Sequence, residues 1–357
     1  MNRTFTKNDS QAMKGIAILL MLLHHLFYSR DSAHGLPVSY LLLNTKQMVA
    51  AARFCKICVP AFVFVTAYGM AAKYETIGQG RKHFGKLTLR RYVSLMVSFL
   101  FVYVLAFVFC QAGGMRSYRE VYGTGAKSVL YAVIDMLGMT YFTDTPTMNP
   151  TWWYMSVAIL LIFVLPVIWK LTEKIGLLLV PALAAVMVVL KLQNNQAMLC
   201  LLTAAVGVWC EKRRFFDRIS AILGKRTGYR IMGALAYLAV IAGLLVLKIR
   251  TGNRLWVLIY PLSAVSIAGV LCCGSGEGWI YRMLRFFGRY SMYMFLTHTF
   301  LKSYYLHDFI YGFGQAEVIY AVLIGLSAAL AMALAFLERK FREKLRINEK
   351  IDRILVD

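Results

Sequence analysis

Lys14, His24 and His25 are the residues whose types and spacing first indicate chemistry. They lie in the stretch KGIAILLMLLHH, residues 14–25, where eight apolar residues separate a Lys-Gly pair from two histidines. On an α-helix, eleven steps of about 100° end within about 20° of three full turns, about 16 Å along the axis. Lys14 and His25 therefore share one helix face, whereas His24 projects about 80° from Lys14.

His25 is consequently a candidate general base. An ionisable residue deep in an apolar helix usually faces a cavity or a partner. A neutral imidazole accepts a proton from a hydroxyl near pH 7. The alternative is a histidine that is hydrogen-bonded to a neighbouring helix for a structural reason.

The composition predicts that this helix belongs to an all-α protein, a polytopic membrane helical bundle. Of the 357 residues, 59% are hydrophobic and 16% are charged, whereas soluble domains carry about 25% charge. We expect about ten transmembrane helices plus one short half- or interfacial helix at 127–140, which is too short to cross a hydrocarbon core of ~30 Å. The predicted spans are 13–28, 48–72, 91–112, 152–169, 175–190, 196–210, 231–249, 255–273, 290–306 and 317–337.

The basic residues predict how these helices are oriented. The net charge is +23, and the cations lie mostly in the short segments between apolar blocks. With both termini cytoplasmic, 28 of the 40 Lys and Arg residues fall inside, as the positive-inside rule requires. We predict one membrane domain, 1–357, with cytoplasmic tails at 1–12 and 339–357. This charge distribution indicates a lipid bilayer as partner and argues against nucleic acid, which needs cations gathered on one surface.

The seven cysteines predict neither a disulfide framework nor a metal site. All of them lie in or beside apolar blocks, where a free cysteine behaves as a small hydrophobe. Cys55 and Cys58 have the spacing of a redox or metal pair, but there is no second pair, and we interpret them as packing residues. No metal is expected.

The opening stretch resembles the start of the acyltransferase-3 family of integral membrane acyltransferases (O-acetyltransferase-like). That start has an Arg-Gly pair and a histidine eleven residues after the arginine. Here Lys14 stands where arginine is usual and His25 is in place. Lysine keeps the charge and loses the planar, bidentate guanidinium.

Three later stretches resemble the same family in the same order. In VPAFVFVTAYG, Thr66-Ala67 stands where Ser-Gly is usual. TWWYMSVAILLIFVLPVI is similar to the start of a long family helix, with Trp153, Tyr154 and Pro166 matching. GRYSMYMFLTH is similar to a late span, with matches at Gly288, Ser291 and His298.

The resemblance implies an enzyme of the bacterial plasma membrane (the inner membrane). It would transfer an acyl group, expected to be acetyl, from coenzyme A to a hydroxyl of a cell-envelope glycan or a similar acceptor. On this hypothesis His25 is the base, Lys14 holds a coenzyme phosphate or helps to form the charged end of the channel, and Ser291 and His298 donate to the oxyanion. Among the other expected substrate-binding residues, Arg90 and Arg91 would hold the phosphates of coenzyme A, and Asn149, Trp153 and Tyr154 would line a channel. His24 is the remaining member of this set.

Several alternatives stay open on the sequence. Arg90 and Arg91 could serve only as positive-inside anchors, and Arg53 and Lys56 either face a polar acceptor cavity or extend outward to the interface. Asp135 could orient a histidine. The second functional hypothesis is a transporter or permease for a small polar solute such as an amino acid (serine-type), although the predicted spans contain few acidic residues. A third is an interaction protein without catalysis.

Overall fold

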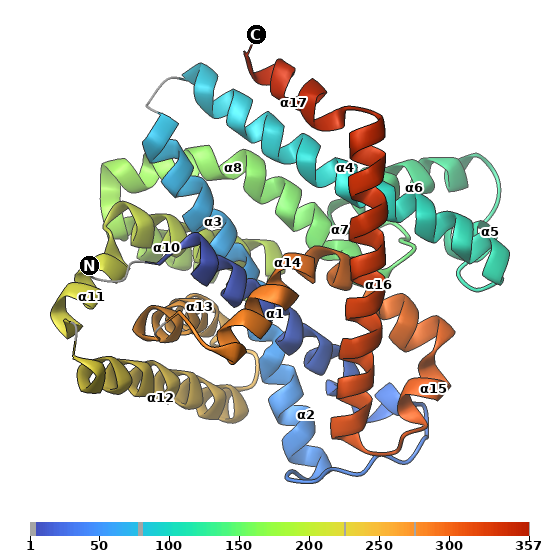
Figure 1. Cartoon of the computed structure of the whole chain (residues 1–357), viewed down its shortest axis with the longest axis horizontal. Helices are drawn as coiled ribbons and strands as arrows, with labels where there is room; N and C mark the ends of the chain where they lie inside the picture. Colours follow the sequence, from blue (N-terminus) through green and yellow to red (C-terminus); the bar gives the residue numbers. More distant parts are fainter. Residues whose placement is uncertain (1–4, 78–80, 225, 275, 357) are drawn as a thin grey trace. The chain divides into compact units, whose positions relative to one another are not determined.

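The structure, a computed structural model, describes residues 5–77, 81–224, 226–274 and 276–356 (Figure 1). Nearly all of these residues are helical, and they include no β-strand beyond one isolated bridge between Ser39 and Gln315. The predicted all-α membrane bundle is confirmed. The first four residues of the predicted N-terminal tail and the last residue of the predicted C-terminal tail lie outside the described residues.

Within the described residues, seven helical segments are long and apolar enough to cross a membrane. The ten predicted blocks are almost entirely helical, but they do not map one to one onto these seven segments. The seven segments are Lys7–Phe27, Thr45–Thr76, Phe84–Gly113, Pro150–Val189, Thr227–Thr251, Trp256–Cys273 and Ala316–Lys344.

The difference in number arises at three places. Helices α8 (Trp153–Ile175) and α9 (Leu179–Val189) are joined by a short turn at Gly176, so they count as one segment. Helix α10 (Gln196–Lys212) has 17 residues, one turn or so less than a typical span. Helix α14 (Trp279–Thr299) begins eleven residues before the predicted block at 290 and includes three arginines.

The chain forms two compact units, each assembled from separated stretches of sequence. Unit 1 comprises residues 1–32, 42–78 and 164–291, and unit 2 comprises 33–41, 79–163 and 292–357. Helices α8 and α14 contribute residues to both units. The prediction of one membrane domain stays a prediction.

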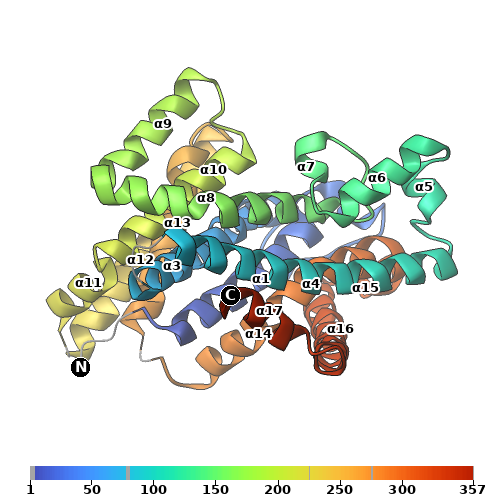
Figure 2. The ribbon, with the colours of Figure 1, turned by 90° about the horizontal axis from the view of Figure 1, so that it is seen from above.

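Unit 1 is built around α1, which contacts α2, α3 and α13, while α10 contacts α3 and α13. Figure 1 shows α12 beside α13, and only 6% of the apolar stretch of α12 is buried, as expected for a helix that faces lipid. Figure 2 shows α9 folded back on α10. The remaining bounds in this unit are α1 (Lys7–Phe27), α2 (Thr45–Phe54), α3 (Cys58–Ile77), α11 (Phe215–Leu223), α12 (Thr227–Thr251) and α13 (Trp256–Cys273).

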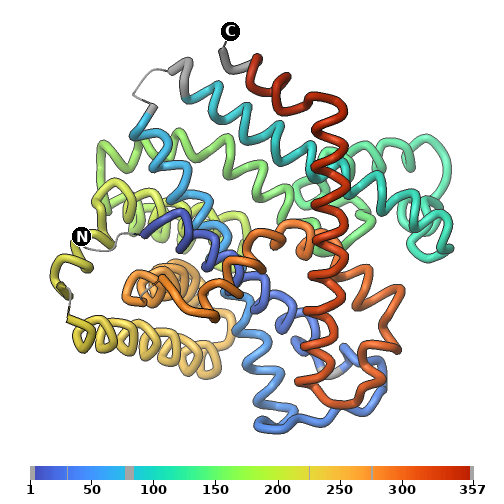
Figure 3. Tube along the Cα trace, in the orientation of Figure 1, coloured from blue at the N-terminus to red at the C-terminus, as the bar shows by residue number. Residues whose placement is uncertain are grey.

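Unit 2 is built on two long helices, α4 (Arg81–Gly113) and α16 (Ala316–Lys344). Figure 3 follows the chain from α16 into α17, which contacts α4. The predicted short block at 127–140 corresponds to one short helix, α6, and α7 begins at the last residue of the block. The remaining bounds are α5 (Tyr118–Tyr122), α6 (Ala126–Met136), α7 (Thr140–Thr143), a π-helical turn (Phe300–Tyr305), α15 (His307–Tyr311) and α17 (Ile347–Val356).

A buried carboxylate ties three helices of unit 2 together. Glu338 of α16 is 1% exposed and accepts hydrogen bonds from the Tyr293 hydroxyl at 2.7 Å and the Ser98 hydroxyl at 2.8 Å. The Arg342 guanidinium pairs with the same carboxylate. All of these partners lie within unit 2. The hydrogen-bond network therefore holds α4, the end of α14 and α16 together.

Candidate active site

Helix α1 runs unbroken from Lys7 to Phe27, so Lys14, His24 and His25 lie on one rigid element. It begins six residues before the predicted span because Thr6 and Asp9 form a capping box. The Thr6 hydroxyl accepts from the Asp9 N–H, and the Asp9 carboxylate accepts from the Thr6 N–H. Asp9 also accepts the Tyr281 hydroxyl at 2.7 Å, which fixes the start of α1 against α14.

Lys14 is positioned by the glycine that follows it. A Cβ atom placed on Gly15 would lie 1.9 Å from the Leu284 carbonyl oxygen, and one on Gly288 would lie 1.8 Å from the Gln11 carbonyl oxygen. The backbones of α1 and α14 therefore cross in direct contact, which only glycine permits. Gly15 of the Lys-Gly pair and Gly288 of GRYSMYMFLTH therefore both lie at the point where α1 crosses α14.

His24 is held by the backbone of α2. Its Nδ1 lies 2.7 Å from the Ala52 carbonyl oxygen, and because a carbonyl only accepts, Nδ1 carries the hydrogen. A neutral His24 then has an unprotonated Nε2. The His25 ring contacts the His24 ring edge to face at 5.0 Å, so the bond to Ala52 also restrains the neighbourhood of His25.

Arg53 lies at the same end of α1. Its Nε donates to the Tyr28 carbonyl at 2.9 Å, where the helix leaves carbonyl groups without intrahelical partners. The Arg53 side chain is exposed, whereas Lys56 is half-buried. Arg53 is therefore accessible to a solute while it caps the helix.

In unit 2, Asn149 is buried and connects two segments. Its side-chain nitrogen donates to the Leu296 carbonyl at 3.1 Å, and its side-chain oxygen accepts from the Thr151 N–H at 3.0 Å. Trp152 Nε1 donates to the same Leu296 carbonyl at 3.1 Å. Sequence reasoning selected Trp153 and missed Trp152, because adjacent tryptophans in an apolar block carry no signal about which one faces the core.

Trp153 and Tyr154 are half-buried at the start of α8. The Trp153 ring lies 5.8 Å from the Tyr141 ring, and the Tyr154 ring lies 5.8 Å from that of Phe295. Trp153 and Tyr154 thus follow Asn149 closely in the sequence, but they are only partly buried, whereas Asn149 is completely buried.

His298 is completely buried, and both of its ring nitrogens are hydrogen-bonded. Nδ1 lies 2.9 Å from the Phe295 carbonyl oxygen, and Nε2 lies 3.2 Å from the Thr299 hydroxyl. Seven residues earlier on α14, the Ser291 hydroxyl donates to the Gly288 carbonyl at 3.0 Å. Thr151 and Thr299 connect the His298 and Asn149 networks at 3.2 Å, and sequence reasoning singled out neither threonine.

Arg90 and Arg91 lie in the first third of α4, nine and ten residues after the helix begins. Arg90 forms an exposed ion pair with Asp352 of α17 at 2.9 Å. Arg91 is exposed and interacts electrostatically with Tyr154. The C-terminal helix therefore supplies a counter-ion to one of the two arginines, a contact that the sequence did not predict.

Asp135 is completely buried in α6 and accepts three hydrogen bonds. The donors are the Tyr122 hydroxyl at 2.7 Å, the Thr147 hydroxyl at 2.8 Å and the Met148 N–H at 2.7 Å. Burial raises the pKa of this carboxyl, and the three bonds act in the opposite direction. Asp135 thus orders the loop before Asn149, and none of these three donors is a histidine.

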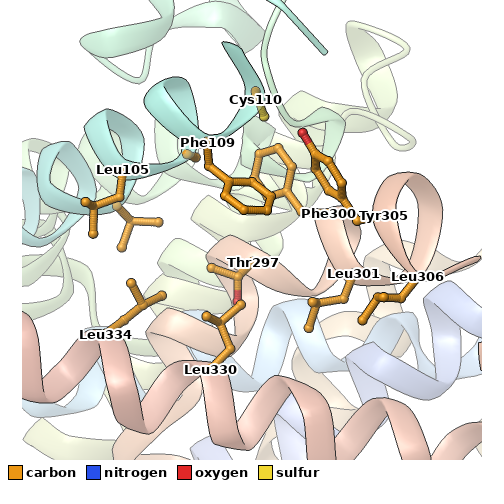
Figure 4. Close-up of a pocket in the computed structure, with 12 residues that line it drawn as sticks. Leu105, Phe109, Cys110, Thr297, Phe300, Leu301, Tyr305, Leu306, Leu330 and Leu334 are labelled. Carbon is orange, nitrogen blue, oxygen red and sulfur yellow. The ribbon is translucent and has the colours of Figure 1, made fainter. Parts of the chain in front are cut away.

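Unit 2 also contains an apolar groove of about 440 Å³ between α4, α16 and the π-helical turn (Figure 4). Leu105 and Phe109 line one side and Leu330 and Leu334 another, with Phe300 and Leu301 between them. Its lining is almost entirely apolar, which offers little to orient a polar acceptor.

The predicted site residues fall into two groups. Unit 1 contains Lys14, His24, His25 and Ser291, and unit 2 contains Arg90, Arg91, Asn149, Trp153, Tyr154 and His298. The described residues include no group of three or more histidine, cysteine or acidic side chains arranged to hold a metal ion. All seven cysteines are buried and present as thiols.

The long apolar helices are those of an integral membrane protein, and one of them carries the histidine pair. A comparison with family models is decisive: the acyltransferase-3 family model, described as an acyltransferase domain, matches residues 8–338. The chain belongs to this family. No curated protein and no solved structure gave a significant match. The family identifies the protein as an acyltransferase that transfers groups other than aminoacyl groups.

Proposed function

We propose that this membrane acyltransferase moves an acetyl group from coenzyme A to a hydroxyl of a cell-envelope glycan or a similar acceptor. The enzyme would reside in the bacterial inner membrane with both termini in the cytoplasm. One observation carries the proposal: Lys14 and His25 lie on a single unbroken helix, eleven residues apart. The cation and the base then share one helix face about 16 Å apart, a span suited to a long thioester donor.

In this mechanism an unprotonated ring nitrogen of His25 accepts the proton of the acceptor hydroxyl. The hydroxyl oxygen attacks the thioester carbonyl carbon and the carbon–sulfur bond breaks. The protonated His25 then returns the proton to the thiolate, so the coenzyme leaves as the thiol. Lys14 holds a coenzyme phosphate as a point charge, because an ammonium lacks the two-pronged geometry of a guanidinium. Arg90 and Arg91 contribute further positive charge where the coenzyme phosphates approach.

Ser291 and His298 are the proposed donors to the developing oxyanion. For His298 this requires exchange of one present bond, because both ring nitrogens are engaged in unit 2. Asn149, Trp153 and Tyr154 are proposed to border the acyl channel. The bonds from Asn149 and Trp152 to the Leu296 carbonyl support a positioning role for this segment next to His298.

The test compares wild type with His25→Ala in nanodiscs, with acetyl-coenzyme A binding and thiol release measured separately. We expect both proteins to bind the donor and His25→Ala to release thiol about 10²- to 10⁴-fold more slowly. His34→Ala is the control, because His34 is exposed, stacks on His307 at 4.3 Å and has no part in the proposed mechanism. Unchanged thiol release by His25→Ala would exclude His25 as the base.

A further inference from the structure

A second, polar cavity lies within unit 1 beside the histidine pair. It has a volume of about 370 Å³, within the range of ~300–1,000 Å³ typical of small-molecule sites. Two segments line it: the turn that follows α1, and α2. The lining residues are Ser29, Asp31, Lys46, Val49, Ala50 and Arg53.

Two hydrogen bonds connect this cavity to the candidate base. The Ala52 carbonyl holds His24, and the Tyr28 carbonyl accepts from the cavity residue Arg53. The first lining residue, Ser29, follows His25 by four residues, which corresponds to about 6 Å at 1.5 Å per residue. Figure 3 shows α1 in the darkest blue, and α2, in a lighter blue, is in contact with it.

The charge around the cavity is mainly positive. Lys46 and Arg53 line it, and Asp31 supplies an acidic side chain. Lys248, from the end of α12, is close enough to Arg53 and Lys56 for their charges to interact. On the predicted topology these cations lie at the outer end of the helices, where the positive-inside rule disfavours them. Their presence there calls for a reason other than topology.

Capping of α1 explains only part of this arrangement. Arg53 uses one of its five N–H donors for the Tyr28 carbonyl, which leaves the two terminal nitrogens of the guanidinium. Lys46 lies in the first turn of α2, where Asn44 accepts the Gln47 N–H and an ammonium cannot accept from an N–H group, so capping does not account for Lys46. Clustered cations in a small concave site are the usual means of binding a carboxylate or a phosphate.

We propose that this cavity binds the anionic group of the acyl acceptor, so that the acceptor is an acidic sugar whose hydroxyl is presented to His25. The proposal rests on the proposed function for the identity of the reaction. Arg53 makes the directional contact to the carboxylate or phosphate, and Lys46 adds a second charge. A sugar without an acidic group gains neither interaction.

The experiment uses the full chain in nanodiscs and three probes with one ring: glucose, glucuronate and glucose 1-phosphate. Binding is measured by calorimetry without donor, for wild type, Arg53→Gln, Lys46→Gln and the control Lys191→Gln. Lys191 is an exposed cation of unit 1 that does not line the cavity, so the control makes the same change in charge. We expect both acidic probes to bind more tightly than glucose, and each cavity variant to lose about tenfold or more.

Glucuronate and glucose 1-phosphate distinguish a carboxylate from a phosphate. The probe that binds more tightly identifies the acidic group of the acceptor. Equal binding of glucose and the acidic probes, no binding of any probe, or equal losses in Lys191→Gln would each overturn the proposal. Lys46→Gln keeps the test valid if loss of the Arg53 cap unfolds the protein. Thiol release from acetyl-coenzyme A is measured in parallel: its absence, with charge-dependent binding intact, would overturn the proposed reaction and leave the acidic site standing.

Discussion

His24 and His25 are adjacent in sequence but differ in how they are held. His24 donates its Nδ1 hydrogen to the Ala52 carbonyl and contacts the Tyr28 ring at 5.5 Å, so α2 and the end of α1 fix its orientation. His25 shares the face of Lys14. We therefore interpret His24 as a positioning residue that restrains the base by ring contact and by joining α1 to α2.

A pair of substitutions at His24 tests this interpretation. His24→Ala removes the donor and leaves a buried carbonyl without its partner, which costs about 1–3 kcal/mol of folding free energy. We expect kcat to fall by about tenfold, far less than for His25→Ala. His24→Asn places an amide N–H near the position of Nδ1 and should restore most of the loss. The measurement is thiol release against pH, together with thermal unfolding.

The outcomes separate the roles clearly. If His24 is a positioning residue, His24→Asn restores thiol release, and the dependence of thiol release on pH stays that of wild type. If His24→Asn were as inactive as His25→Ala, His24 would itself be the base, since asparagine cannot accept the proton.

At the scale of elements, helix crossings explain the glycines of the sequence motifs. Gly15 and Gly288 face each other's backbones where α1 crosses α14, so the two glycines set the position of Lys14. A related pairing occurs between α3 and α10, where a Cβ on Gly207 would lie 3.2 Å from that of Ala67. The missing family glycine at position 67 is therefore compatible with close packing, because the opposite helix supplies one.

The crossing predicts a large effect of a single methyl group. Gly288→Ala would place a carbon 1.8 Å from the Gln11 carbonyl oxygen, which forces the helices apart. We expect a loss of about 3 kcal/mol or more in folding free energy, at the upper end for overpacking. Thermal unfolding in detergent measures it.

Gly69→Ala on α3 is the matched control, because nothing lies within 4 Å of a Cβ there. It should be neutral or slightly stabilising, since alanine favours a helix over glycine by ~1 kcal/mol. Equal stability of both variants would show that α1 and α14 do not cross at these glycines.

At the scale of the whole molecule, the sequence predicted the class of fold. Hydrophobic blocks of sufficient length indicate membrane-spanning helices, and the basic segments between them indicate their orientation. It also predicted α13 within one residue, Trp256–Cys273 against 255–273. The start of α1 was missed because the Thr6–Asp9 capping box lies outside the apolar block. The Arg90–Asp352 pair and the link between Asn149 and Leu296 join residues more than 140 positions apart, and one sequence contains no signal for such pairings.

The number of crossings determines where the two ends of the chain lie. Seven crossings would place the termini on opposite sides, whereas ten place them together, and the seven segments come from length and composition alone. An odd number would move either the basic stretch after Glu338 or the N-terminus out of the cytoplasm, against the distribution of 28 and 12 cations. We therefore predict an even number of crossings, in which α10 and α14 cross in addition to the seven segments. The 40-residue segment Pro150–Val189, about 60 Å of helix, supplies two crossings with the turn at Gly176 inside it.

Fusions of a fluorescent protein that folds only in the cytoplasm test this prediction at both termini. Fluorescence is expected at each end, and absence of signal from a fusion in the loop at Gly252 serves as the internal control, because that loop is predicted to be external. A signal from one terminus alone would require an odd number. A cytoplasmic N-terminus places the cavity at Arg53 near the outer end of α1, whereas an external N-terminus would place it on the cytoplasmic side. The same fusions therefore decide whether an acceptor from outside the cell can reach the cavity beside His25.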